Sequence, residues 1–120
     1  MGQPVVHWEI AGKDAVKLQE FYSGIFDWKV NVDEALNYGI VETGRQGGID
    51  GGIFAPPNGA APYTMFYVHV DDIQKYLYKI ESLGGKTMMP PREIPGVGSA
   101  AVFSDPDGNS VGLFTGETVS

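Results

Sequence analysis

The chain repeats one pattern of strand, aspartate and amphipathic helix in its two halves. The first copy occupies residues 5–28, and the second occupies residues 64–85. When His7 is aligned with Met65, the apolar and acidic positions of the two copies coincide. A repeat of this kind predicts two copies of one supersecondary unit, and the facing sheets of two such units can enclose a pocket.

The first copy predicts one helix and four strands. The strands are expected at residues 5–10, 28–32, 38–43 and 49–55. Asp14 is the expected N-cap, because its side chain can accept hydrogen bonds from the first free helix amides. An apolar stripe at helical spacing predicts that the helix packs on the sheet. This stripe comprises Leu18, Phe21, Tyr22 and Ile25.

The second copy predicts the same order. Its strands are expected at residues 65–70, 86–89, 100–104 and 110–115, and Asp72 is the expected N-cap of its helix. The apolar stripe of this helix comprises Ile73, Tyr76, Leu77, Ile80 and Leu83. The predicted fold class is therefore α+β, with two tandem βαβββ modules at about 5–55 and 64–117. A proline- and glycine-rich linker at 56–62 joins the modules within one domain, residues 1–120.

Composition excludes several classes of function. The chain has 120 residues, with 15 acidic and 8 basic side chains and a net charge of -7. Nucleic acids and anionic membranes select basic surfaces, so neither is an expected partner. There are no cysteines, no apolar run approaches the length of a membrane span, and no signal peptide is recognised at the N-terminus. We therefore expect a cytoplasmic location.

Side-chain alternation divides the first strand of each module into two faces. His7 and Glu9 share one face, and Trp8 is expected to pack on the helix side. In the second module, Met65, Tyr67 and His69 share the face that corresponds to His7 and Glu9.

Three motifs, taken in order, resemble the vicinal-oxygen-chelate superfamily, which includes glyoxalase I, the bleomycin-resistance proteins and the extradiol dioxygenases. His7 precedes Asp14 by seven residues, the stretch 21–28 reads FYSGIFDW, and the turn 105–109 reads DPDGN. The resemblance extends from about residue 5 to residue 117. It implies that each βαβββ unit forms half of a cup-shaped mixed sheet, that ligands bind inside the cup, and that the protein is a homodimer.

The resemblance also implies a divalent metal held by four ligands, one each from the first and last strands of each module. The metal would act as a Lewis acid on two neighbouring substrate oxygens. His7 matches one ligand position, whereas Met65, Gly52 and Gly112 occupy the other three. We therefore expect no metal of the usual kind. The resemblance implies a relation to lactoylglutathione lyase, but standard glyoxalase I activity is not expected.

A different metal site is an alternative. A set formed by His7, Glu9 and His69 has suitable ligand atoms. The simpler interpretation is that His7 and Glu9 are polar cup residues that contact a ligand, water or each other.

Further ligand-contacting candidates are apolar. Tyr67, Phe54 and Phe114 are candidates for an aromatic pocket wall, and Met65 for an adaptable lining. Ordinary core packing is the alternative for each of them. The glycines at the two carboxylate positions would open volume in the cup.

Three functions remain. The first is a metal-free protein that binds a small organic molecule in the cup or at a dimer interface. The second is a lyase or isomerase in which His7 and Glu9 are catalytic, with the carboxylate raising the pKa of the histidine. The third is an assembly domain without a small-molecule role. The sequence does not identify the ligand.

Overall fold

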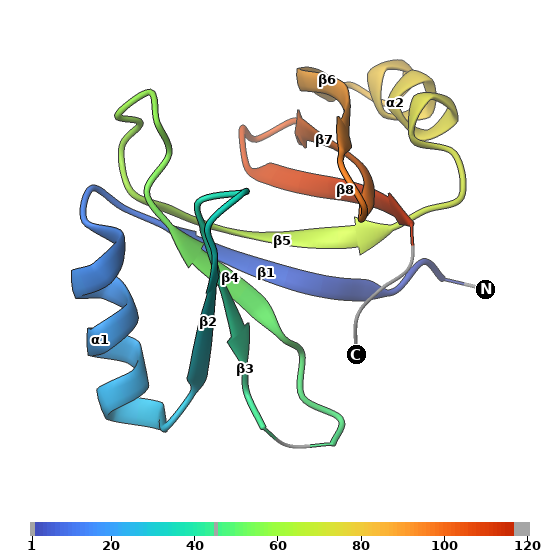
Figure 1. The fold of residues 1–120 in the computed structure, drawn as a ribbon. Coiled ribbons are helices and arrows are strands. Elements are labelled where there is room, and N and C mark those ends of the chain that lie inside the picture. The colour runs from blue at the N-terminus through green and yellow to red at the C-terminus, as the bar shows by residue number, and fades with distance from the viewer. Residues whose placement is uncertain (1, 45, 117–120) are drawn as a thin grey trace. The chain divides into compact units, whose positions relative to one another are not determined.

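A computed structural model describes residues 2–44 and 46–116. Its elements follow the order βαβββ twice, which confirms the predicted α+β class (Figure 1). The chain divides into two compact units. We call residues 7–64 the first unit, and residues 2–6 together with 65–116 the second unit. The predicted end of module two, residue 117, lies outside the described residues.

The first unit carries four strands and one helix. Its elements are β1 (Val5–Ala11), whose first two residues belong to the second unit, α1 (Ala15–Phe26), β2 (Lys29–Asp33), β3 (Tyr38–Glu42) and β4 (Gly51–Phe54). The strands lie in the order β2-β3-β4-β1. β1 is parallel to β4, and the other neighbours are antiparallel. The parallel pairing places the start of the repeat beside its last strand.

The second unit repeats this arrangement. Its elements are β5 (Tyr63–His69), whose first two residues belong to the first unit, α2 (Ile73–Ser82), β6 (Lys86–Ile94), β7 (Gly98–Ser104) and β8 (Ser110–Gly116). β5 is parallel to β8, and β7 joins β8 to β6 by antiparallel pairing. β6 continues five residues beyond its predicted end, through Pro90 and Pro91. A strand with a free edge tolerates proline, and the register of β6 shifts in this stretch.

Both helices begin at the predicted aspartate caps. Asp14 Oδ1 accepts from the backbone N–H of Lys17 at 3.1 Å, and Asp72 Oδ1 accepts from that of Lys75 at 3.2 Å. Each cap satisfies an amide that the first helical turn leaves without a partner.

The core of the second unit lies between α2 and its strands. Ile73 and Leu77 of α2 pack with Val70, Ala101 and Leu113, as the predicted stripe requires. Leu83 does not join this core, contrary to the prediction, because α2 ends at Ser82 and Leu83 is 72% exposed.

α1 presents a different face to its sheet from the one predicted. Phe21 and Ile25 of the expected apolar stripe are 59% and 53% exposed, whereas Gln19 is buried. Gln19 Nε2 donates to the backbone carbonyl of Ile53 at 2.9 Å. Its amide group occupies the space beside Gly39, where a side chain would collide with it. A hydrogen bond from Gln19 therefore holds α1 against β4, and part of the aromatic surface of α1 stays exposed to solvent.

None of the helices within residues 2–44 and 46–116 has the length and apolarity that crossing a lipid bilayer requires.

Candidate functional site

A hydrogen-bonded chain of side chains lies on one face of β1. His7 Nε2 lies 2.8 Å from the hydroxyl of Tyr38, and that hydroxyl donates to Glu9 Oε1 at 3.2 Å. Because a tyrosine has one proton to donate, the Tyr38 oxygen accepts from His7 when it donates to Glu9. This assigns the Nε2–H tautomer to His7. The two predicted site residues of β1 thus share a face and are joined through a residue of β3.

Glu9 accepts a hydrogen bond from a second tyrosine. Tyr63 donates its hydroxyl to Glu9 Oε2 at 2.8 Å, so each carboxylate oxygen accepts one phenolic proton. Glu9 is only 6% exposed. A buried carboxylate is costly unless hydrogen-bond donors surround it, and the two tyrosines supply those donors. We call His7, Tyr38, Glu9 and Tyr63 the tyrosine–glutamate cluster.

Burial controls the charge state of His7. Loss of solvent lowers the pKa of His7 below its ordinary value of 6.5, and the negative charge of Asp50 only partly opposes this. A carboxylate does raise this pKa, but it is Asp50 and not the predicted Glu9, and burial outweighs it so that the net shift is downward. His7 is a neutral imidazole near pH 7, with one nitrogen as donor and the other as acceptor.

Gly52, at one expected carboxylate position, is covered by an aromatic ring. β3 pairs Ile40 with Gly52, and Tyr38 lies two residues away on the same face. A Cβ atom on Gly52 would overlap the ring and hydroxyl of Tyr38. The ring of Phe54 lies 5.1 Å from that of Tyr38, so this predicted wall residue packs against the same tyrosine.

Gly112, at the other expected carboxylate position, is covered in the same way. It is the parallel partner of Tyr67, and a Cβ atom on Gly112 would overlap the Tyr67 ring. Aromatic side chains commonly fill the gap above a strand glycine. The prediction that these two glycines open volume is wrong, because tyrosine rings occupy that volume.

The remaining candidates lie in the second unit. Met65 and Tyr67 are buried, at 7% and 9% exposure. His69 Nε2 lies 2.9 Å from the carbonyl oxygen of Gly116, to which it donates, and its ring lies 6.1 Å from that of Phe114. His69 and Phe114 therefore form a pair at the ends of two neighbouring strands.

The residues present do not fit the metal that the resemblance implies. His7 supplies one nitrogen, and its Nε2 is hydrogen-bonded to Tyr38. Met65 offers a thioether, a poor ligand for a borderline divalent ion. The glycine positions offer no ligand atoms, and tyrosine rings fill the space above them. Within residues 2–44 and 46–116, no three His, Asp or Glu side chains are grouped so that they could hold a metal ion.

Sequence reasoning missed Tyr38 and Tyr63. Tyr38 begins a predicted strand, and the glycine on the next strand was a signal that a large ring would cover it. Tyr63 follows the linker directly and lay outside the predicted strand, which began at Met65. β5 begins at Tyr63 instead, and this brings its hydroxyl to Glu9.

Comparisons with known proteins agree with the fold. The profile of the Glyoxalase/Bleomycin resistance protein/Dioxygenase superfamily matches residues 5–113. CFP32 of Mycobacterium tuberculosis, named as a glyoxylase, is 27% identical over 119 residues, which cover 93% of this chain and 46% of that protein. The anthracycline biosynthesis protein DnrV of Streptomyces peucetius is 26% identical over 117 residues, 84% of this chain and 42% of that protein. This chain thus spans about half the length of these relatives.

Two solved structures are similar in fold at low sequence identity. Methylmalonyl-CoA epimerase from Mycobacterium tuberculosis aligns with a TM-score of 0.67 at 13% identity, covering 94% of this chain and 87% of that one. The hypothetical protein BH1468 from Bacillus halodurans aligns with a TM-score of 0.71 at 13% identity, covering 100% and 99%.

Proposed function

Because the chain belongs to the glyoxalase/bleomycin resistance protein/dioxygenase superfamily, we propose that it is a small-molecule-binding member that works without a divalent metal. One observation carries the proposal. The ring of Tyr38 fills the space above Gly52, and its hydroxyl joins His7 to Glu9. Around His7 and Gly52, where the resemblance implies metal ligands, the side chains are hydrogen-bonded to one another.

The tyrosine–glutamate cluster can recognise a polar group through hydrogen bonds alone. A neutral His7 donates its Nε2–H to Tyr38 and has Nδ1 as an acceptor nitrogen, and the Glu9 carboxylate orients the tyrosine hydroxyls. The rings of Tyr38 and Phe54 add apolar surface beside these polar atoms. Binding sites for small molecules combine apolar surface with a few placed polar groups in this way.

Metal analysis and thermal stability test the proposal together. The protein is incubated with Ni²⁺, Zn²⁺ or Mn²⁺, desalted, and analysed for bound metal. A library of planar organic molecules, thiols and dicarbonyls is screened by thermal shift. We expect substoichiometric metal, no metal-dependent shift, and stabilisation by an organic compound that the Tyr38→Phe variant reduces. One equivalent of metal that disappears in His7→Ala would contradict the proposal.

A second candidate is a lyase or isomerase related to lactoylglutathione lyase. The observation in its favour is the neutral His7, which can accept a proton and is connected to Glu9 through the hydroxyl of Tyr38. Its test is exchange of the α-proton of carbonyl compounds in D₂O, followed by proton NMR. Exchange that is lost in both His7→Gln and Glu9→Gln supports the enzyme, and exchange at the uncatalysed rate excludes it for those compounds.

The homodimer and the cytoplasmic location remain predictions. Light scattering after size exclusion gives the mass of the protein in solution, and a mass of one chain at micromolar concentration would contradict the dimer. Fractionation of the source cells checks the location.

A further inference from the structure

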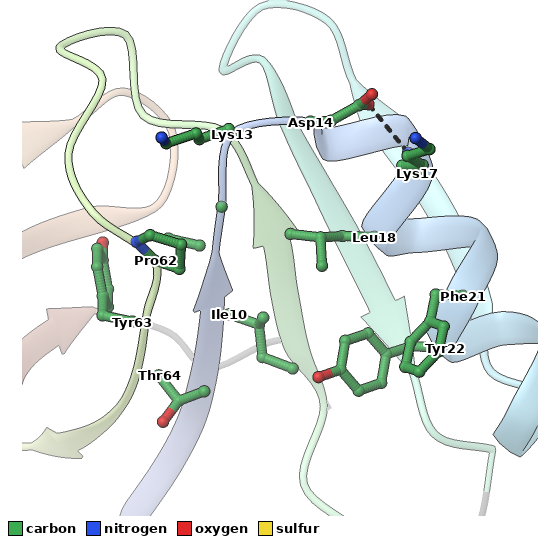
Figure 2. A pocket seen from close by; sticks show the side chains of 12 residues that line it. Ile10, Lys13, Asp14, Lys17, Leu18, Phe21, Tyr22, Pro62, Tyr63 and Thr64 are labelled. Carbon is green, nitrogen blue, oxygen red and sulfur yellow. Dashed lines mark hydrogen bonds between the residues drawn. The ribbon is translucent and has the colours of Figure 1, made fainter.

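The first unit also has a concavity beside α1, on the face that Ile10 presents (Figure 2). Side-chain alternation along β1 puts Ile10 on the opposite face from Glu9. The concavity has a volume of about 770 Å³. Its lining comes from the end of β1, the first turns of α1 and residues 62–64.

The size and lining of this pocket suit an organic ligand. Pockets for small molecules usually measure roughly 300–1,000 Å³ and are mostly apolar. Here Ile10, Leu18, Phe21 and Tyr22 converge on one space, as Figure 2 shows. Phe21 is 59% exposed, and its ring lies 5.1 Å from that of Tyr22 in an edge-on arrangement. The exposed stripe of α1 is thus explained in part as the wall of a pocket.

The rim of the pocket is basic in an acidic protein. Lys13 and Lys17 both line it, although the whole chain has only 8 basic residues and a net charge of -7. Neither lysine forms an ion pair with any residue in the described ranges 2–44 and 46–116. Asp14 also lines the pocket, and its carboxylate accepts the backbone amide of Lys17 as the helix cap. The lining therefore contains two lysines and one carboxylate, and that carboxylate already accepts a hydrogen bond.

We propose that this pocket binds an organic anion with a flat apolar body. The body lies against Phe21 and Tyr22, and the anionic group lies beside Lys13 and Lys17. Charge complementarity at the rim selects the anion, and apolar burial against the floor supplies most of the affinity. The pocket lining includes Tyr63 of the tyrosine–glutamate cluster but none of His7, Glu9 and Tyr38. Variants of Lys13 and Lys17 therefore test this proposal, and variants of His7 and Tyr38 test the proposed ligand site.

The aromatic rings that contact Tyr22 provide an optical signal. The Tyr22 ring lies 5.9 Å from that of Trp28 at an interplanar angle of 13°, and Trp28 lies 5.0 Å from Trp8. A ligand that contacts Tyr22 changes the surroundings of this stack. Binding is therefore expected to change the tryptophan fluorescence of the protein.

Two dyes that share one ring system test the role of charge. Anilinonaphthalene sulfonate carries an anionic group, and phenylnaphthylamine is the same body without it. Each is titrated into the full chain while dye and tryptophan fluorescence are followed. We expect saturable binding of the sulfonate, tighter than that of the uncharged dye. No saturable binding of the sulfonate, or equal binding of both dyes, would overturn the proposal.

Charge variants test whether Lys13 and Lys17 cause the preference for the anionic dye. Lys13→Gln/Lys17→Gln is expected to weaken sulfonate binding about fivefold, since exposed ionic contacts contribute only modestly to affinity, and to leave binding of the uncharged dye unaffected. The matched control, Lys75→Gln/Lys79→Gln, removes the same charge from α2, which does not line this pocket. An equal loss in the control, or no loss in the first variant, contradicts binding at this rim.

A third variant checks that the dyes occupy the apolar floor. Phe21 is mostly exposed, so Phe21→Glu is expected to fold normally, as circular dichroism would show. It places a carboxylate at the pocket and should weaken both dyes, the sulfonate more strongly. Unchanged binding of the sulfonate in the folded variant would place the dye elsewhere and overturn the proposal.

Discussion

Tyr38 lies across Gly52 on the neighbouring strand, and its hydroxyl connects His7 to Glu9. One residue thus performs two tasks, since its ring fills the space above a glycine and its oxygen completes a polar chain. The two tasks can be separated experimentally, because a phenylalanine keeps the ring and an alanine at position 52 disturbs it.

Gly52→Ala is expected to destabilise the fold by about 1–3 kcal/mol, because the new methyl group overlaps the Tyr38 ring. Urea denaturation measures the change. Gly24→Ala is the control, because Gly24 lies within α1 with open space around it and should be neutral or gain roughly 0.5–1 kcal/mol. In a Tyr38→Ala background the cost of Gly52→Ala should shrink, and an unchanged cost would show that the ring is not its cause.

Tyr38→Phe is expected to cost about 1–3 kcal/mol of stability. The ring still covers Gly52, but His7 loses an acceptor and the buried Glu9 carboxylate loses a donor. Thermal and urea denaturation measure the loss. Tyr78, which is 66% exposed, provides the control, and Tyr78→Phe should change stability by less than about 0.5 kcal/mol. Equal effects of the two variants would argue against a structural role for the Tyr38 hydroxyl.

Because of His7, the free energy of unfolding should fall when the pH is lowered mildly. Burial lowers the pKa of His7 in the folded chain, so the unfolded chain binds a proton more readily. This contribution to stability is complete above the ordinary pKa of 6.5 and is lost as the pH falls toward the folded pKa. One proton contributes a slope of at most about 1.4 kcal/mol per pH unit. Urea denaturation across this range should give a flatter profile for His7→Gln than for the wild type, and parallel profiles would refute the assignment.

Leu77→Ala is expected to cost about 2–5 kcal/mol, because Leu77 is 1% exposed and lies in the core of the second unit. Leu83→Ala serves as its control, since Leu83 follows the end of α2 and is 72% exposed. Its effect should stay within about 0.5 kcal/mol. Calorimetry distinguishes the two, and a large loss in Leu83→Ala would mean that this side chain has a contact not seen in the structure.

The carboxyl of Asp105, in the turn between β7 and β8, should stay ionised to a lower pH than an ordinary aspartate. The Asn109 side-chain amide holds the pKa of the Asp105 carboxyl below its ordinary value of 3.8, and backbone amides of the turn add to this. At a pH above the ordinary pKa, the lowered pKa of Asp105 stabilises the turn. This stabilisation is lost as the pH falls through the pKa that Asp105 has in the folded chain. Asn109→Ala should raise the pKa in a carbon NMR titration, whereas Asn58→Ala in the linker should leave it unchanged.

The repeat in the sequence was sufficient to predict the order and type of the elements. The aspartate caps and the apolar positions of α2 are local signals, and both helices begin where those signals indicate. α1 differed because its buried residue is a glutamine. The partner of that glutamine is a carbonyl oxygen of Ile53, which no periodicity of apolar residues can reveal.

The candidate site was predicted only in part, for a related reason. Alternation along β1 placed His7 and Glu9 on one face, and the structure has them there, joined through Tyr38. The tyrosines that complete the cluster come from β3 and β5. Their arrival depends on strand register across the sheet, and a sequence reveals that register poorly when a glycine is the facing residue.

The tyrosine over each carboxylate position also limits how this chain can be re-engineered for metal chelation. A glutamate introduced at position 52 or 112 alone would collide with Tyr38 or Tyr67. Removal of either ring alone would leave a hole above a bare backbone. Each carboxylate therefore requires two simultaneous replacements on neighbouring strands. A stepwise mutational path must pass through a weakened fold, so single-substitution libraries would not find chelating variants, whereas paired libraries could.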